Sequence, residues 1–132
     1  MKTETLYMIA DDNGISLDFF ELPVTKSVCV KHNGKCYIAI DPSQTSTKAA
    51  ERVCLAHELG HCQTDSFYNI YAPLDNRGKH ERKADIWAIN KLIPKKELVE
   101  AIKKGHREIS ELAEYFSVTE VFMRKALEIY SN

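Results

Sequence analysis

One short pattern, His57-Glu58-Leu59-Gly60-His61, restricts this sequence more than any other feature. On an α-helix, residues four apart lie on one face, so the imidazoles of His57 and His61 can reach the same metal ion. Glu58, the next residue, points in a different direction from the helix axis than His57 does. Its carboxylate can therefore contact a water molecule at an open coordination position of the metal ion. The pattern therefore predicts a helix that supplies two ligands and a general base to a hydrolytic zinc site, with one Zn²⁺ per chain.

The residues around the pattern argue against two histidines on a solvent-exposed helix. Most positions preceding and within the pattern are apolar, namely Val53, Leu55, Ala56 and Leu59. Burying two histidines and a glutamate among such residues without partners costs free energy, so we expect them to have partners. Cys62, which follows His61, points to a different helix face and is a poor candidate for a further ligand of the same ion.

A third ligand is expected from the next helical segment, at residues 80–88. Helical spacing places two acids and two small residues on one face of this segment: Glu81, Ala84, Asp85 and Ala88. The alanines allow that face to approach another helix closely. Glu81 then completes a His-His-Glu site, and Asp85 is placed to accept the outer N–H of a ligand histidine. The alternatives are His80 or Asp85 as the third ligand, or Glu81 in a solvated charged turn.

Two segments together resemble the active site of the ImmA/IrrE metallopeptidases. They are Cys54–Cys62 and Glu81–Ala88, the second followed by Leu92-Ile93-Pro94. The family pattern is a glutamate, Ala-Asn or Ala-Asp, an aromatic-Ala pair and an apolar-Pro helix end. This sequence keeps each element, with Trp87 where phenylalanine is commoner, and the resemblance extends over residues 27–130.

The resemblance implies a bacterial zinc protease, often carried by a phage or mobile element, that cleaves a helix-turn-helix repressor. It also implies His57, His61 and Glu81 as metal ligands and Glu58 as general base. A further donor is expected for the oxyanion, and the candidates for oxyanion or substrate contacts are Tyr68, Tyr71 and His80. Two other functions stay open: a non-catalytic, zinc-stabilised repressor-binding or DNA-binding module, and a toxin with a different hydrolytic target. The presence of Glu58 favours an enzyme over the non-catalytic module, because a structural zinc site needs no base.

Charge and composition give no support for a nucleic-acid or membrane partner. The formal net charge is −1, and binding to DNA depends on neutralising phosphates. Residues 109–119 resemble the start of a helix-turn-helix, but the chain from Lys95 onward carries seven basic and seven acidic side chains. We therefore expect no direct nucleic-acid binding, and a helical hairpin that closes the core, with substrate docking as the alternative. No apolar run approaches the ~20 residues of a membrane span, and acids interrupt the amino terminus, so we expect a cytoplasmic protein.

The four cysteines (Cys29, Cys36, Cys54 and Cys62) form no C-x-x-C pair. A zinc site made of thiolates is therefore not expected. In a reducing compartment they are interpreted as small apolar residues.

The pattern of apolar residues and turns predicts an α+β fold in one domain, residues 1–132. Residues 1–45 are expected to form a helix (Lys2–Asp12), a strand (Ile15–Phe19) and a hairpin turning at Asn33-Gly34, together a small antiparallel sheet. Residues 46–94 hold the zinc-site helices, one capped by Thr45 or Ser46 and running from Lys48 to Cys62, and one from Lys79 to Leu92 after a loop. Residues 95–132 continue as helices Lys95–Lys104, Glu108–Phe116 and Thr119–Tyr130. The result is a small sheet beside a zincin-like active-site helix, with a mostly helical second half.

Overall fold

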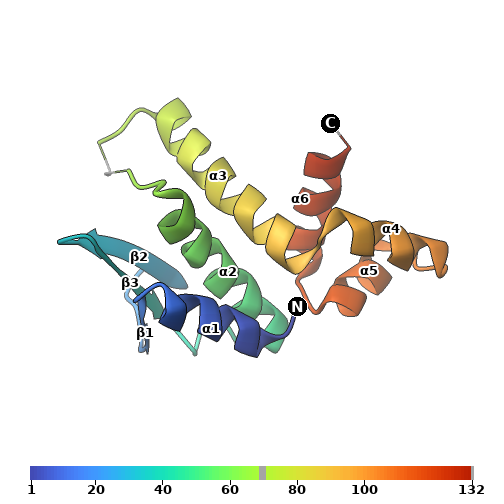
Figure 1. Ribbon diagram of the computed structural model, residues 1–132, viewed down its shortest axis with the longest axis horizontal. Helices are drawn as coiled ribbons and strands as arrows, with labels where there is room; N and C mark the ends of the chain where they lie inside the picture. The colour runs from blue at the N-terminus through green and yellow to red at the C-terminus, as the bar shows by residue number, and fades with distance from the viewer. Residues whose placement is uncertain (69–70, 132) are drawn as a thin grey trace.

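The fold is α+β, as predicted, and its elements follow the expected order along the chain (Figure 1). The computed structural model describes residues 1–68 and 71–131. Helix α1 (Thr3–Asp12) precedes the strands β1 (Ser16–Phe19), β2 (Ser27–His32) and β3 (Lys35–Ile40). The rest of the described chain is helical: α2 (Lys48–Thr64), α3 (Leu74–Leu92), α4 (Lys95–Lys103), α5 (Ile109–Phe116) and α6 (Glu120–Tyr130).

The hairpin between β2 and β3 turns where the sequence predicts it. The two strands pair antiparallel, with Cys29 opposite Ile38 and His32 opposite Lys35. Asn33 and Gly34 have φ angles of 51° and 76°. Both central residues therefore have the positive φ that a type I′ turn requires, which confirms the predicted turn.

The prediction that the whole sheet is antiparallel is wrong for its first strand. The strand order is β1-β3-β2, and β1 runs parallel to β3 with Leu17 opposite Ile38. The hairpin signal determines only how β2 and β3 pair. Residues 20–26 carry the chain from one edge of the sheet to the other, so β1 and β3 run in the same direction.

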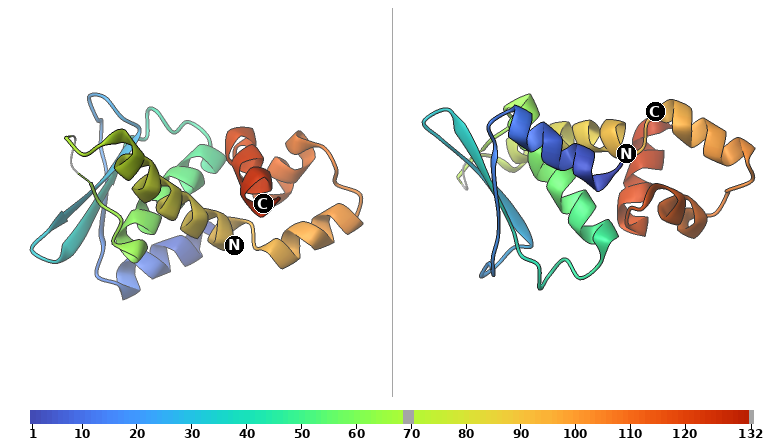
Figure 2. Two further views of the ribbon diagram at one scale, coloured as in Figure 1. Left: turned by 90° about the horizontal axis from the view of Figure 1, so that it is seen from above. Right: turned by 60° about the horizontal axis from the view of Figure 1, so that its bottom comes forward.

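Helix α2 lies in the middle of the molecule, between the sheet and α3 (Figures 1 and 2). Its fully buried residues Leu55, Ala56 and Leu59 belong to one apolar core that also contains residues of every other helix and of the central strand. Because the predicted active-site pattern is on α2, this packing places it between two elements that can each contribute side chains to it.

The capping residue of α2 and the start of α3 differ from those predicted, although α2 itself begins at Lys48 as predicted. The side chain of Thr47, and not that of Thr45 or Ser46, caps α2 by accepting a hydrogen bond from the Ala50 N–H at 3.0 Å. Helix α3 begins at Leu74, five residues before the predicted start at Lys79. Proline is tolerated immediately before the first turn of a helix, and an exposed helical glycine costs only about 1 kcal/mol, so Pro73 and Gly78 do not interrupt α3. Residues 69 and 70 of the predicted loop lie outside the described residues.

The carboxy-terminal helices close the core as predicted. Pro94 separates α3 from α4, and Gly105 has a φ of 104° beyond the end of α4. Thr119 caps α6 by accepting from the Phe122 N–H at 3.2 Å. Six apolar residues of α5 and α6 are buried in the common core: Leu112, Ala113, Phe116, Phe122, Met123 and Ala126. In the described part of the chain, no helix is long and apolar enough to cross a membrane.

Candidate metal centre

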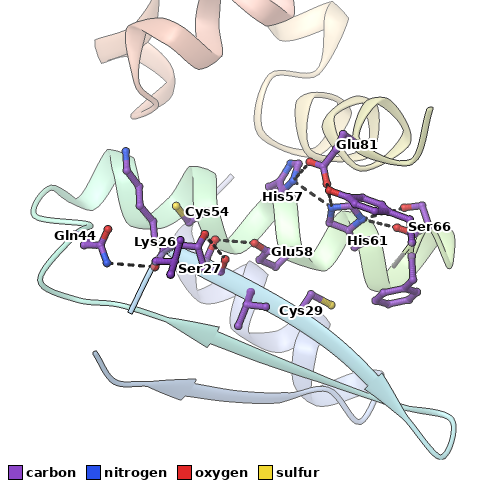
Figure 3. A pocket seen from close by; sticks show the side chains of 15 residues that line it. Lys26, Ser27, Cys29, Gln44, Cys54, His57, Glu58, His61, Ser66 and Glu81 are labelled. Atoms are coloured by element: carbon purple, nitrogen blue, oxygen red, sulfur yellow. Dashed lines mark hydrogen bonds and ion pairs between the residues drawn. The ribbon is translucent and has the colours of Figure 1, made fainter. Parts of the chain in front are cut away.

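The side chains of His57, His61 and Glu81 meet at the contact between α2 and α3 (Figure 3). The Nε2 atoms of the two histidines are 3.2 Å apart, with the rings edge to face. Glu81 Oε2 lies 2.9 Å from His57 Nε2, and Glu81 Oε1 lies 3.1 Å from His61 Nε2. One turn of α2 therefore presents two nitrogens to one carboxylate from the facing helix.

These separations are those expected of ligands around one small metal ion. Tetrahedral zinc, with bonds of about 2.0–2.1 Å, keeps its ligand atoms about 3.3 Å apart. Two imidazoles and a carboxylate form a donor set common in zinc sites, and also one that manganese and iron accept. Because both the donor atoms and their spacing fit, the three residues could hold a divalent metal ion.

Each histidine is oriented by a hydrogen bond from its outer ring nitrogen. His57 Nδ1 donates to Asp85 Oδ1 at 2.8 Å. His61 Nδ1 donates to the backbone carbonyl of Ser66, which the chain brings back immediately after α2 ends. With Nδ1 carrying the proton, Nε2 of each ring is the atom available to a metal ion. Lys125 Nζ lies 3.1 Å from Asp85 Oδ2 and so connects α6 to this arrangement.

Glycine at position 60 allows α3 to approach this closely. A Cβ atom at Gly60 would lie 2.5 Å from the carbonyl oxygen of Ala84 and 3.0 Å from two other backbone atoms of that residue. Ala84 and Ala88 are fully buried on the facing side of α3. The two helices therefore touch through backbone and small side chains, which brings Glu81, one turn from Ala84, within reach of the histidines.

The ionisable groups of the centre shift one another's pKa. Burial by itself lowers the pKa of His57, but its hydrogen bonds to Asp85 and Glu81 outweigh burial and raise that pKa to about 10. Hydrogen bonds from His57 and His61 hold the pKa of Glu81 far below its usual range. Burial by itself raises the pKa of Asp85, but the hydrogen bond from His57 helps to hold that pKa below its usual value. Without a metal ion, protonated His57 therefore holds two carboxylates that would otherwise repel each other.

Glu58 lies beside the centre and toward the sheet (Figure 3). Its side chain is buried, and Oε2 accepts a hydrogen bond of 2.6 Å from the hydroxyl of Ser27, at the start of β2. Glu58, His57, His61 and Glu81 all line one cavity of about 880 Å³, whose wall on the sheet side is formed by residues 24–29. The carboxylate is thus held by β2 and faces the same space as the candidate ligands.

The three candidates for oxyanion or substrate contacts have different positions. Tyr68 lines the cavity, and its hydroxyl donates to Glu81 Oε1 at 2.9 Å. His80 stacks on the Tyr68 ring at a centroid distance of 6.0 Å, but it is not among the residues lining the cavity, and its Nδ1 is buried without a hydrogen-bond partner among the described residues. Tyr71 is 87% exposed and does not line the cavity either. Tyr68 thus contacts Glu81, a residue of the centre, through its hydroxyl.

The sequence analysis missed Ser27, Ser66 and Lys125. Ser66 acts through its backbone carbonyl, which any residue at that position would provide, so the sequence contains no signal for it. Ser27 and Lys125 reach the centre from β2 and α6, which are distant in sequence, and neither lies in a recognisable motif. A tertiary contact is what identifies each of them.

Comparison with protein families gives a match over most of the chain. The family model of the IrrE N-terminal-like domain, Peptidase M78, matches residues 11–128. No curated protein and no solved structure matches the chain. The matched range contains every residue of the centre described above.

Proposed function

This chain belongs to the Peptidase M78 family of IrrE N-terminal-like domains, and we propose that it is a zinc-dependent endopeptidase. Family membership implies a metallopeptidase type of function. The observation that carries the proposal is the convergence of His57, His61 and Glu81, with donor atoms 2.9 to 3.2 Å apart, beside the buried carboxylate of Glu58. A site of purely structural zinc would have no use for that fourth residue.

Each residue of the centre has a proposed role. His57, His61 and Glu81 hold the ion, and Asp85 and the carbonyl of Ser66 orient the two imidazoles. When bound, zinc would supply Lewis-acid chemistry, lowering the pKa of water toward neutrality and polarising a carbonyl. Glu58 would take up the proton of the attacking water and pass it to the leaving amine, while the hydrogen bond from Ser27 restricts the orientation of its carboxylate. Tyr68 is the candidate that donates a hydrogen bond to the oxyanion, because its hydroxyl already faces Glu81.

The proposed substrate is a cytoplasmic helix-turn-helix repressor. The family implies a protein substrate, and the resemblance to the ImmA/IrrE metallopeptidases supports a repressor in particular. The cavity is lined along one side by residues 24–29, which end in the edge strand β2. A cavity that follows an edge strand suits an extended peptide, because main-chain pairing to the strand tolerates varied side chains.

Metal content tests the ligand assignment. We expect about one zinc per chain in wild type and in Glu58→Gln, and a loss or strong weakening of zinc binding in Glu81→Ala, because two imidazoles alone leave the ion with too few protein ligands. Elemental analysis of the purified proteins after exhaustive dialysis against a weak chelator measures this.

The control for that experiment is Asp75→Ala, which removes an exposed carboxylate from the first turn of the same helix. It should bind zinc like wild type. Full zinc retention in Glu81→Ala would move the third ligand to His80 or Asp85. No zinc in any variant or in wild type would remove the basis of the peptidase proposal.

Zinc affinity should rise with pH. In the metal-free protein the pKa of His57 is about 10, so His57 is protonated at neutral pH and must release a proton before Nε2 can bind a metal ion. Zinc affinity should therefore increase about tenfold per pH unit for each proton released. It should level off as the pH passes the pKa of His57 in the metal-free protein.

Zinc competition titrations at several pH values between 7 and 9 measure the slope. Asp85→Asn removes a carboxylate that raises the pKa of His57, so its slope should flatten at a lower pH than that of wild type. A zinc affinity that does not depend on pH in this range would show that His57 is already neutral in the metal-free protein.

A further inference from the structure

Three of the four cysteines meet at a second place in the fold. The Sγ atoms of Cys29, Cys36 and Cys62, here called the thiol cluster, all lie within 4.8 Å of one another. The Sγ atoms of Cys29 and Cys62 are 3.1 Å apart, and all three residues are free thiols. From the sequence these residues were interpreted as small apolar side chains, and the lack of a C-x-x-C pair gave no indication of a thiolate site.

The fold holds the cluster from three different elements. Cys29 is on β2 and pairs with Ile38, two residues beyond Cys36 on β3, so the two cysteines are diagonal neighbours on the same face of the hairpin. Cys62 comes from α2, which packs against the hairpin. Because the hairpin register and the helix position are both set by the core, the three sulfur atoms meet without any local sequence motif.

The geometry of the cluster resembles that of a three-coordinate metal site. Three thiolates around one ion, with metal–sulfur bonds of about 2.3 Å, would have their sulfur atoms about 4 Å apart. Cys29 Sγ and Cys62 Sγ are closer than that, at 3.1 Å, and no pair of the three sulfur atoms is more than 4.8 Å apart. All three residues are only half-buried, and Cys29 also lines the 880 Å³ cavity, which gives an ion a route of entry. Lys31 lies opposite Cys36 in the hairpin, with its Nζ in an ion pair of 2.7 Å with Asp65.

We propose that the thiol cluster is a second metal site, which binds a soft, thiophilic ion with the chemistry of Cu⁺. Thiolate ligands favour such ions over harder divalent cations, and three ligands suit Cu⁺ better than Zn²⁺, which prefers four in structural sites. The site is separate from the His-His-Glu centre, because the two share no ligand. The proposal therefore does not depend on the proposed peptidase function.

Anaerobic titration with Cu⁺, in competition with a chromophoric Cu⁺ chelator, tests the site. Wild type should withdraw about one Cu⁺ per chain from the chelator and develop an ultraviolet thiolate-to-copper absorption band. Cys36→Ser, which keeps the shape of the side chain, should weaken binding at least about 100-fold, because a hydroxyl is a hard and poor ligand for Cu⁺. The double variant Cys29→Ser/Cys62→Ser should neither withdraw Cu⁺ from the chelator nor develop the ultraviolet band. Circular dichroism of each variant checks that it is folded.

Two matched variants separate the sites. Cys54→Ser removes the cysteine of α2 that lies outside the cluster, and it should bind Cu⁺ like wild type. Glu81→Ala should also keep Cu⁺ while losing zinc, so failure of one site does not imitate failure of the other. The proposal is overturned if wild type takes no Cu⁺, if Cys36→Ser binds as wild type does, or if Cys54→Ser loses binding equally. It is also overturned if Cys29 and Cys62 form a disulfide in protein purified under reducing conditions.

Discussion

Replacing Glu58 by glutamine is expected to lower the rate of peptide cleavage by about 10²–10⁴-fold, the usual contribution of a general base, while zinc stays bound. Glutamine keeps the size of the side chain, and its amide oxygen can still accept the hydrogen bond from Ser27. It cannot take up the proton of a water molecule. The substitution therefore removes one chemical step without removing a metal ligand.

The measurement is single-turnover cleavage of a helix-turn-helix regulator encoded near the gene, followed by mass spectrometry of the products. Zinc content is determined on the same samples. Glu114→Gln makes the same chemical change on the exposed side of α5 and should cleave at the wild-type rate. An unchanged rate in Glu58→Gln would show that Glu58 is not the base, and a joint loss of rate and zinc would show that it helps to hold the metal.

Replacing Gly60 by alanine is expected to weaken zinc binding by about 10–100-fold, the range seen when the support of a metal ligand is disturbed. The new Cβ would lie 2.5 Å from the carbonyl oxygen of Ala84, a backbone atom that cannot move unless α3 moves. Moving α3 outward carries Glu81 away from the histidines. Alanine adds about 1 kcal/mol of helix propensity, but overpacking at a tight helix contact costs about 1–3 kcal/mol, so the metal-free protein should also lose stability.

Zinc competition and urea unfolding of the metal-free protein measure the two effects. Gly78→Ala is the matched control, because Gly78 is also helical but a Cβ there would meet nothing within 4 Å. That variant should bind zinc like wild type and gain up to about 1 kcal/mol of stability. If Gly60→Ala behaved like Gly78→Ala, close contact between α2 and α3 would not be what positions Glu81.

Much of the candidate site could be predicted because it depends on the period of a helix. A spacing of four residues puts His57 and His61 on one face wherever the helix packs. The same period puts Glu81 and Asp85 on the side of α3 that carries Ala84 and Ala88, and this is why both acids could be nominated together. The hairpin turn was equally predictable, because Asn33 and Gly34 adopt a positive φ more readily than other residues do.

Boundaries and strand pairing were less predictable. Pro73 and Gly78 are often loop residues, yet both are compatible with the observed start of α3 at Leu74. The parallel pairing of β1 with β3 depends on the course of residues 20–26, which contain no turn signal that specifies it.

The sequence by itself thus determined what is local: helix faces, the hairpin turn, the cap at Thr119 and the chemical nature of the candidate metal ligands. Only the tertiary structure decided which distant groups meet. It placed Ser27 against Glu58, Lys125 against Asp85, and the three sulfur atoms of the thiol cluster around one point. The physical reason is that backbone geometry specifies the direction of a side chain over a few residues, whereas contacts between distant segments depend on how a whole core packs around α2.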